Sequence, residues 1–170
     1  MDEPDVVEEL VSQWSDARPD LNFEVMGLYA RLNRFVLISG RDLEEQMQRY
    51  GISTGEFDVL ATLRRTGSPY TLKPSALARQ VMLTAAGMTS RLDKLEAAGF
   101  VKRFPDPDDR RSAPVGLTAA GIRLIDKLVV VHLGNEERLF ETLKPTQRKR
   151  LDSILRALSH PTGSITPGRV

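Results

Sequence analysis

The stretch TLKPSALARQVMLTAAGMTSRLDKLEAAGFVKRF, residues 71–104, decides the fold of this chain. Its turn-forming and apolar residues predict a strand or turn, a helix, a tight turn, a second helix and a strand. Ser75 follows a proline and is expected to cap the first helix. Thr84 is expected to cap the second helix, which should run to Ala98 and stop at Gly99. Two short helices joined this tightly predict a helix-turn-helix.

The second helix is expected to have an apolar side and an unusually small polar side. Met88, Leu92 and Leu95 recur at helical spacing and should face the core. Small residues on the other side let the backbone approach another surface, and hydroxyl groups near a helix N-terminus suit phosphates and base edges in a major groove. These are the properties of a recognition helix. The residues of the two helices expected to contact DNA are Ser75, Thr84, Ala85, Ala86, Thr89, Ser90 and Lys94.

A hairpin is expected to follow the second helix. Residues 100–104 and 113–117 predict two strands, joined by the turn PDPDDRRS. A hairpin beside a helix-turn-helix is a wing, and arginines at its tip can enter the minor groove of DNA, where the negative potential is strongest. We therefore expect Arg110 and Arg111 to contact DNA, and Asp109 to orient Arg111 through a charge-assisted pair. The alternative is a solvated, salt-bridged turn.

The returning strand of this hairpin is expected to be irregular. It contains Pro114, which has no backbone N–H to donate, and Gly116, which has no side chain to pack. Such residues are tolerated in an edge strand and are unfavourable in the centre of a sheet. The composition therefore favours an edge position for the returning strand over a central one.

Helical periodicity continues on both sides of this segment. Ser53 or Thr54 is expected to cap a helix over residues 55–65, and Thr118 is expected to cap the helix that follows the wing. Apolar residues recur at three- and four-residue steps from about residue 23 to residue 50, and again between residues 118 and 159. This is more apolar helix than a small winged domain needs, so the terminal helices of two chains are expected to intertwine in a homodimer. The predicted fold class is mainly α with a small β wing, in which a winged helix-turn-helix domain carries terminal helices that form a dimerisation layer. The expected parts are an N-terminal extension with a short helix (1–22), a long helix of the dimer layer (23–50), the winged domain (51–117), the C-terminal dimerisation helices (118–159) and a flexible tail (160–170).

Composition narrows the class of protein and its compartment. The chain of 170 residues has no cysteine, which favours a reducing compartment, and a cytoplasmic location is expected. The longest apolar run, residues 128–131, is far too short to cross a bilayer, so no membrane association is expected. The net charge of +1 is unevenly distributed along the chain. Residues 1–24 hold eight acidic residues and one arginine, a net charge of −7, so the remaining residues carry a net charge of +8. This basic excess is a modest indication of a polyanionic partner.

Four segments of the chain resemble the MarR-type regulators of multiple antibiotic resistance. They are EFDVLATL, PSALARQ, MTSRLDKLEAAGFVKR and DPDDRRSAPVGLTAAG, and the resemblance runs from about residue 23 to residue 159. It implies a dimeric winged helix-turn-helix protein, a repressor or less often an activator, that binds a short pseudo-palindromic operator. It further implies that the operator is released when a small, often anionic aromatic ligand binds. Pro114 departs from the usual wing strand of this family.

A narrower resemblance concerns the ligand. The segment QWSDARPDLN, residues 13–22, resembles the N-terminal extension of the urate-responsive branch of the family, and Trp14, Asp58, Arg91 and Arg103 match the positions with which that branch senses its ligand. The resemblance implies an indole stacked on a flat purine, and two arginines that hold its anionic oxygens. The incoming negative charge would repel Asp58, and capture of Arg91 would draw the recognition helix away from DNA.

Each of these four residues also has a purely structural interpretation. Trp14 could anchor a short amphipathic helix, and Asp58 lies in a first helical turn, where the helix dipole favours a carboxylate. Arg91 could contact only a phosphate, and Arg103 could be a strand-edge cation beside Asp106. A ligand of the phenolic class in place of a purine is a further alternative.

Two other classes of protein compete with a DNA-binding regulator. An enzyme is not expected, because His132 and His160 show no metal-ligand spacing and the chain lacks a phosphate-binding glycine loop and a nucleophile elbow. No cofactor and no metal are expected. A winged-helix module for protein contact is the second alternative, because a fold does not fix its use. Its binding would not fall steeply with salt, whereas counterion release imposes that dependence on DNA binding.

Overall fold

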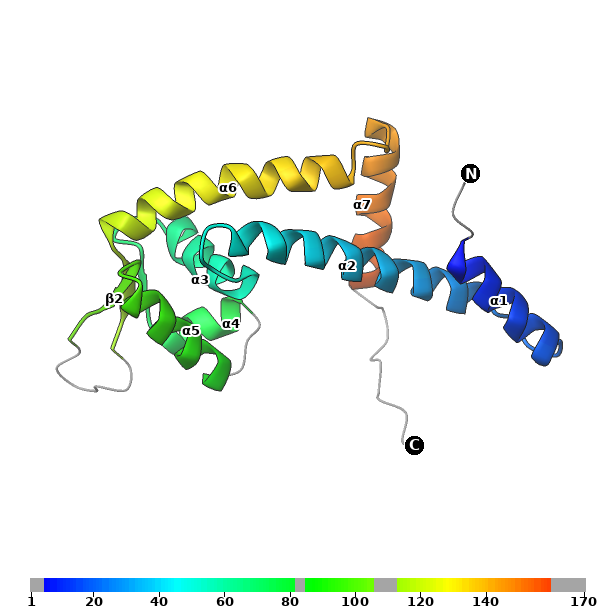
Figure 1. The fold of residues 1–170 in the computed structure, drawn as a ribbon, viewed down its shortest axis with the longest axis horizontal. Coiled ribbons are helices and arrows are strands. Elements are labelled where there is room, and N and C mark those ends of the chain that lie inside the picture. The colour runs from blue at the N-terminus through cyan, green and yellow to red at the C-terminus, as the bar shows by residue number, and fades with distance from the viewer. Residues whose placement is uncertain (1–4, 82–84, 106–112, 160–170) are drawn as a thin grey trace. The chain divides into compact units, whose positions relative to one another are not determined.

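The computed structural model describes residues 5–81, 85–105 and 113–159 of a mainly helical chain. The chain divides into two compact units, Met1–Leu128 and Val129–Val170. Helices and a small antiparallel sheet form the structure, which confirms the predicted fold class (Figure 1). The elements are α1 (Val6–Ala17), α2 (Glu24–Gln48), α3 (Thr54–Arg65), β1 (Thr71–Leu72), α4 (Pro74–Gln80), α5 (Ala85–Ala97), β2 (Val101–Arg103), β3 (Val115–Leu117), α6 (Ala119–Leu139) and α7 (Pro145–Ser159).

Hydroxyl side chains set the starts of two helices, as expected. At α3 the Ser53 hydroxyl accepts a hydrogen bond from the Glu56 backbone N–H at 3.2 Å, and the Glu56 carboxylate accepts one from the Ser53 backbone N–H at 2.8 Å. This reciprocal capping box satisfies two backbone donors at once. At α6 the Thr118 hydroxyl accepts from the backbone N–H of Gly121 at 3.0 Å. Both helices therefore begin where the sequence predicts.

The predicted cap of α4 is wrong. The helix begins at Pro74, and its N-cap is Lys73, so Ser75 lies inside the first turn. Proline suits the first helical position because it lacks an N–H that would have no partner there and its φ is already helical. The Ser75 side chain is exposed, so it remains accessible to a ligand.

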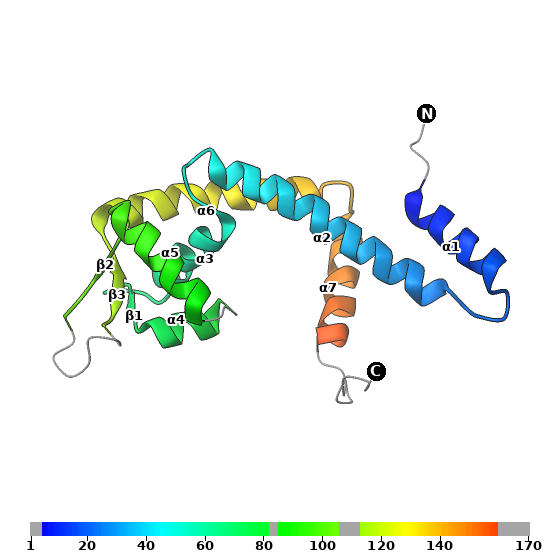
Figure 2. The same ribbon diagram turned by 60° about the horizontal axis from the view of Figure 1, so that its bottom comes forward.

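The predicted edge position of the returning strand is also wrong. The sheet has the order β1-β3-β2, so β3 is the central strand and pairs antiparallel with both neighbours (Figure 2). The misassignment arose because β1 is only two residues long, too short for a periodic signal. Gly116 is required there: a Cβ would lie 2.6 Å from the Thr71 hydroxyl and 2.8 Å from the Phe104 ring. Pro114 precedes β3, so no ladder hydrogen bond within the strand is lost.

The core of the first unit joins the helix-turn-helix to the sheet and to α6. Met88, Leu92 and Leu95, predicted to face inward, are each at most 2% exposed. They belong to one cluster of apolar side chains from α2, α3, α4, α5, the sheet and α6. Other members of this cluster are Phe57, Val59, Leu60, Leu63, Leu77, Val101, Val115, Leu117, Ile125 and Leu128. The buried stripe of α5 therefore determines which side of this helix is exposed to solvent.

Large apolar side chains remain exposed on α2. Val25, Tyr29, Val36 and Leu37 are between 65% and 74% exposed. A contiguous apolar surface of this kind usually marks a contact with another molecule. None of the helices in the described residues combines the length and apolar content needed to cross a membrane.

The second unit presents apolar side chains of its own. In it, the C-terminal part of α6 and α7 line a groove of about 420 Å³. The apolar residues of this groove are Leu133, Phe140, Leu151 and Leu155. Ile154 and Leu158 on α7 are 49% and 59% exposed, so this helix also keeps an apolar surface that no described contact covers.

Candidate functional site

The solvent-exposed side of α5 carries hydroxyl-bearing and polar residues that the sequence predicts for a recognition helix. Thr89, Ser90 and Lys94 are exposed, whereas Leu92 and Leu95 are buried. One side of α5 is therefore buried and the other is polar and exposed. A DNA major groove is wide enough to admit an α-helix with such a polar side. The predicted contact residues Thr84, Arg110 and Arg111, and Asp109, predicted to orient Arg111, lie outside the described residues, as do the side chains of Ala85 and Ala86.

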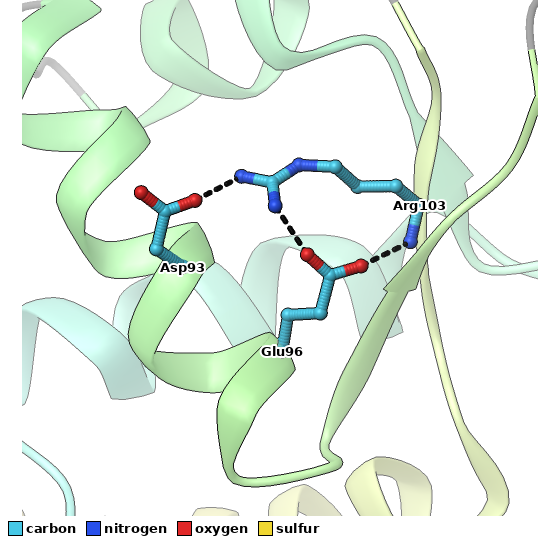
Figure 3. Close-up of polar contacts among 3 residues, drawn as sticks. All are labelled: Asp93, Glu96 and Arg103. Carbon is cyan, nitrogen blue, oxygen red and sulfur yellow. Dashed lines mark hydrogen bonds and ion pairs between the residues drawn. The ribbon is translucent and has the colours of Figure 1, made fainter.

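The strand β2 is bound to α5 through Arg103. The Arg103 guanidinium donates to the Asp93 carboxylate at 2.5 Å and also to the Glu96 carboxylate (Figure 3). The backbone N–H of Arg103 donates to the other Glu96 oxygen at 3.0 Å. The hydrogen bond to Asp93, with the charges of both carboxylates, raises the pKa of Arg103 above its usual value. Arg103 is therefore a strand-edge cation, with partners on α5.

Arg91 lies on the flank of α5 that faces α3. Its guanidinium packs on the first turn of α3, so closely that a Cβ on Gly55 would lie 2.3 Å from its Nε. Asp58 follows Gly55 by three residues and shares that face of α3. The Nη1 of Arg91 is buried, and no acceptor for it is found among the described residues. A buried cationic donor without an acceptor is unfavourable and would be satisfied by an anion.

Trp14 packs on the segment that connects α1 to α2. Its ring stacks on Phe23, with centroids 5.8 Å apart and an interplanar angle of 29°. Phe23 is buried, whereas Trp14 is 47% exposed. Asp5, the N-cap of α1, also pairs with Arg31 of α2 at 2.5 Å, so α1 is held against α2 at both ends. Trp14 is thus an anchor with one part of its ring still accessible.

The described contacts bring only part of the predicted ligand site together. Arg91 lies at the turn of α3 that carries Asp58, whereas the contacts of Arg103 are with α5 and the stacking contact of Trp14 is with Phe23. Among the described residues, no group of three histidine, aspartate and glutamate side chains is arranged to hold a metal ion.

Two acidic residues matter to this architecture and were missed by the sequence reasoning. Glu96 joins Arg103 to α5, and Glu44 of α2 accepts hydrogen bonds from the backbone and hydroxyl of Thr54 at 2.9 and 2.7 Å. The Thr54 hydrogen bonds hold the pKa of Glu44 below its usual value. The spacing of Asp93 and Glu96, three residues apart on the polar side of a helix, was the available signal for a shared cationic partner.

Comparison with known proteins places this architecture among regulators. The model of the MarR family matches residues 52–113. The HTH-type transcriptional regulator PecS of Dickeya dadantii (strain 3937) is 39% identical over 149 residues, which cover 88% of this chain and 90% of PecS. The fold is similar to that of Sco3205 from Streptomyces coelicolor, solved in complex with DNA, with a TM-score of 0.74 and 23% identity over 82% of this chain and 88% of that one. It is also similar to Bordetella bronchiseptica BpsR, whose DNA binding is regulated by 6-hydroxynicotinic acid, with a TM-score of 0.70 and 22% identity over 78% and 98% of the two chains.

Proposed function

Because this chain belongs to the MarR family of transcriptional regulators, we propose that it binds a pseudo-palindromic DNA operator as a homodimer and represses transcription. The observation that carries the proposal is the exposed polar side of α5, where Ser90 and Lys94 lie opposite the buried stripe and the exposed Thr89 lies at its shoulder. That side enters the major groove, and the wing reaches the adjacent minor groove. The similarity to PecS, an HTH-type transcriptional regulator, supports this assignment.

The homodimer follows from the apolar surfaces that one chain leaves open. Val25, Tyr29 and Val36 of α2 are each at least 65% exposed, and α7 keeps further apolar residues exposed. A second copy related by a two-fold axis buries such surfaces. In this arrangement the two recognition helices lie about 34–36 Å apart, which is one turn of DNA. The helices outside the winged domain, residues 23–50 and 118–159, therefore form the dimer layer in this proposal.

A mobility-shift titration on the DNA upstream of the gene for this protein tests DNA binding directly. We expect a specific complex whose affinity falls by about 10³-fold or more between 50 and 200 mM salt, because phosphate contacts release counterions. Scrambled DNA of equal length is the control for specificity. Equal affinity for both DNAs, or an affinity insensitive to salt, would favour a winged-helix module for protein contact.

We further propose that a small aromatic anion such as urate releases the operator. The proposed ligand residues are Trp14, Asp58, Arg91 and Arg103. The exposed part of Trp14 offers a ring to stack on, and the buried Nη1 of Arg91 offers a donor that has no acceptor among the described residues. Arg103 reaches the anion only by giving up one of its carboxylate partners on α5. The regulation of BpsR by 6-hydroxynicotinic acid, an aromatic carboxylate, supports an effector of this chemical class.

Replacing Gly55 with alanine is expected to weaken effector binding while all charges are kept. The new methyl group would lie 2.3 Å from the Nε of Arg91, in the space that the guanidinium occupies. It would displace the flexible end of the Arg91 side chain without disturbing the backbone. We expect urate to quench the fluorescence of Trp14 in the unmodified protein, and Gly55→Ala to raise the apparent Kd by about tenfold or more, the value of one charged hydrogen bond.

The matched control for this variant is Gly40→Ala, because a Cβ at Gly40 of α2 meets no atom within 4 Å. It should leave the titration unchanged. Absence of quenching in the unmodified protein, together with quenching by a phenolic acid such as salicylate, would reassign the effector to the phenolic class. Quenching by urate that is equal in both variants would remove Arg91 from the site.

A further inference from the structure

The wing and the recognition helix are joined by a three-residue cluster on the polar side of α5. Asp93 and Glu96 lie on successive turns of α5, and Arg103 lies at the end of β2, where the strand leads into the wing (Figure 3). A tight turn at Gly99, whose φ is +75°, reverses the chain between them. Arg103 therefore returns beside the helix that it left and meets both carboxylates.

The geometry of this cluster is more restrictive than that of a single surface ion pair. One guanidinium nitrogen donates to Asp93, the other to Glu96, and the Arg103 backbone N–H donates to the second oxygen of Glu96. The Arg103 side chain is 34% exposed, so it is partly shielded from water. The planar guanidinium fixes the direction of each hydrogen bond, and the backbone bond fixes the strand itself. Both the position and the orientation of β2 relative to α5 are thereby determined.

The two carboxylates are unfavourable for DNA binding by charge alone. Asp93 is 59% exposed on the polar side of α5, the side that carries Ser90 and Lys94. A negative charge there repels the phosphates of a duplex, whereas a neutral residue would not. Exposed ion pairs also contribute little to the stability of a fold. The contacts that these two carboxylates do make are with Arg103 at the end of β2.

We propose that Asp93, Glu96 and Arg103 form a clamp that holds the base of the wing on the recognition helix, so that both elements meet the duplex in one fixed orientation. This inference rests on the proposed DNA-binding function. Arg103 acts as a positioning residue, since its guanidinium is directed at α5. Pre-organisation of two contact surfaces increases affinity because less freedom is lost on binding.

The sign of one variant tests the clamp. Asp93→Ala combined with Glu96→Ala removes two negative charges from a surface that approaches DNA, so simple electrostatics predicts tighter operator binding. The clamp predicts weaker binding, by about tenfold, the size of a typical coupling within one network. Tighter or unchanged binding would overturn the proposal. Alanine favours helix, so circular dichroism should show no loss of helix content in this variant.

A second pair of variants separates a clamp from a direct phosphate contact. Arg103→Lys keeps the charge and loses the planar fork, so the clamp predicts that it weakens binding nearly as much as Arg103→Gln. The clamp also predicts that the slope of log K against log salt stays unchanged in both. A direct phosphate contact would be retained by lysine, and its loss in Arg103→Gln would reduce the slope by about 1. That pattern would refute the clamp.

The control is Asp126→Ala, which breaks the exposed ion pair between Asp126 of α6 and Arg64 of α3 at 2.7 Å. It removes a negative charge from the same unit without touching α5 or β2, and operator affinity should not fall. Hydrogen exchange of the β2 amides in the free protein gives a readout without DNA, and the clamp predicts faster exchange in the double alanine variant. Failure of the unmodified protein to bind its operator would refute the proposed function, whereas unchanged exchange would refute the clamp alone.

Discussion

Gly121→Ala is expected to lower the free energy of unfolding by about 2–3 kcal/mol, because the added methyl group has no room. A Cβ at Gly121 in the first turn of α6 would lie 2.0 Å from the carbonyl oxygen of Phe100. That oxygen cannot move easily, since it accepts hydrogen bonds from the backbone and the hydroxyl of Thr118 at 3.0 and 3.2 Å. The methyl group must therefore push α6 away from the start of β2. Urea denaturation followed by circular dichroism measures the loss.

Gly134→Ala is the matched control on the same helix. A Cβ at Gly134 meets no atom within 4 Å, and the residue lies in the interior of α6. Alanine costs less backbone entropy than glycine in a helix, so this variant is expected to be more stable by about 0.5–1 kcal/mol. Equal effects of the two substitutions would show that the close approach of Gly121 to Phe100 does not decide the stability of this corner.

Arg110→Ala combined with Arg111→Ala is expected to weaken operator binding by at least about 30-fold, since each DNA-contacting arginine contributes about 1–3 kcal/mol. Both residues lie in the wing segment, outside the described residues, so the prediction rests on the sequence and on the hairpin that β2 and β3 form. The dimer should persist, as sedimentation or size-exclusion chromatography would show. A mobility-shift titration at constant salt measures the affinity.

The control for this variant removes an equal charge elsewhere. Lys149 and Arg150 are adjacent, exposed residues of α7. Their replacement by alanine lowers the net charge by the same amount, so it reports the effect of charge at long range. An equal loss of affinity in both double variants would mean that the wing makes no specific contact, and the role assigned to Arg110 and Arg111 would be withdrawn.

Local chemistry made most of the fold predictable from the sequence. The inward stripe of α5, the cap at Ser53 and the first turn of α6 at Thr118 depend on residues a few positions apart, and all three were confirmed. Ser75 was misassigned because a proline one position earlier competes for the helix start. The central position of β3 depends on pairing with Thr71–Leu72, a partner more than forty residues away in the sequence, which no local pattern contains.

The candidate site was less predictable because it depends on long-range partners. The exposed side of α5 followed from helical spacing alone. The packing of β2 on α5 determines the partners of Arg103, and the packing of α3 on α5 places Arg91 against Gly55. Sequence periodicity specifies neither packing. Both arginines were identified as important through a family resemblance, and only the structure shows which carboxylates hold Arg103.

The exposed apolar residues of α2 have a genetic consequence. In the proposed homodimer, a subunit that pairs through the exposed Val25, Tyr29 and Val36 would also pair with any chain that keeps the same surface, including one with a damaged wing. In a cell that expresses both the intact and the wing-damaged chain, intact subunits would form mixed dimers that bind only one half-site of the operator. Wing substitutions would then be dominant over the intact allele, whereas a change that prevents pairing would be recessive.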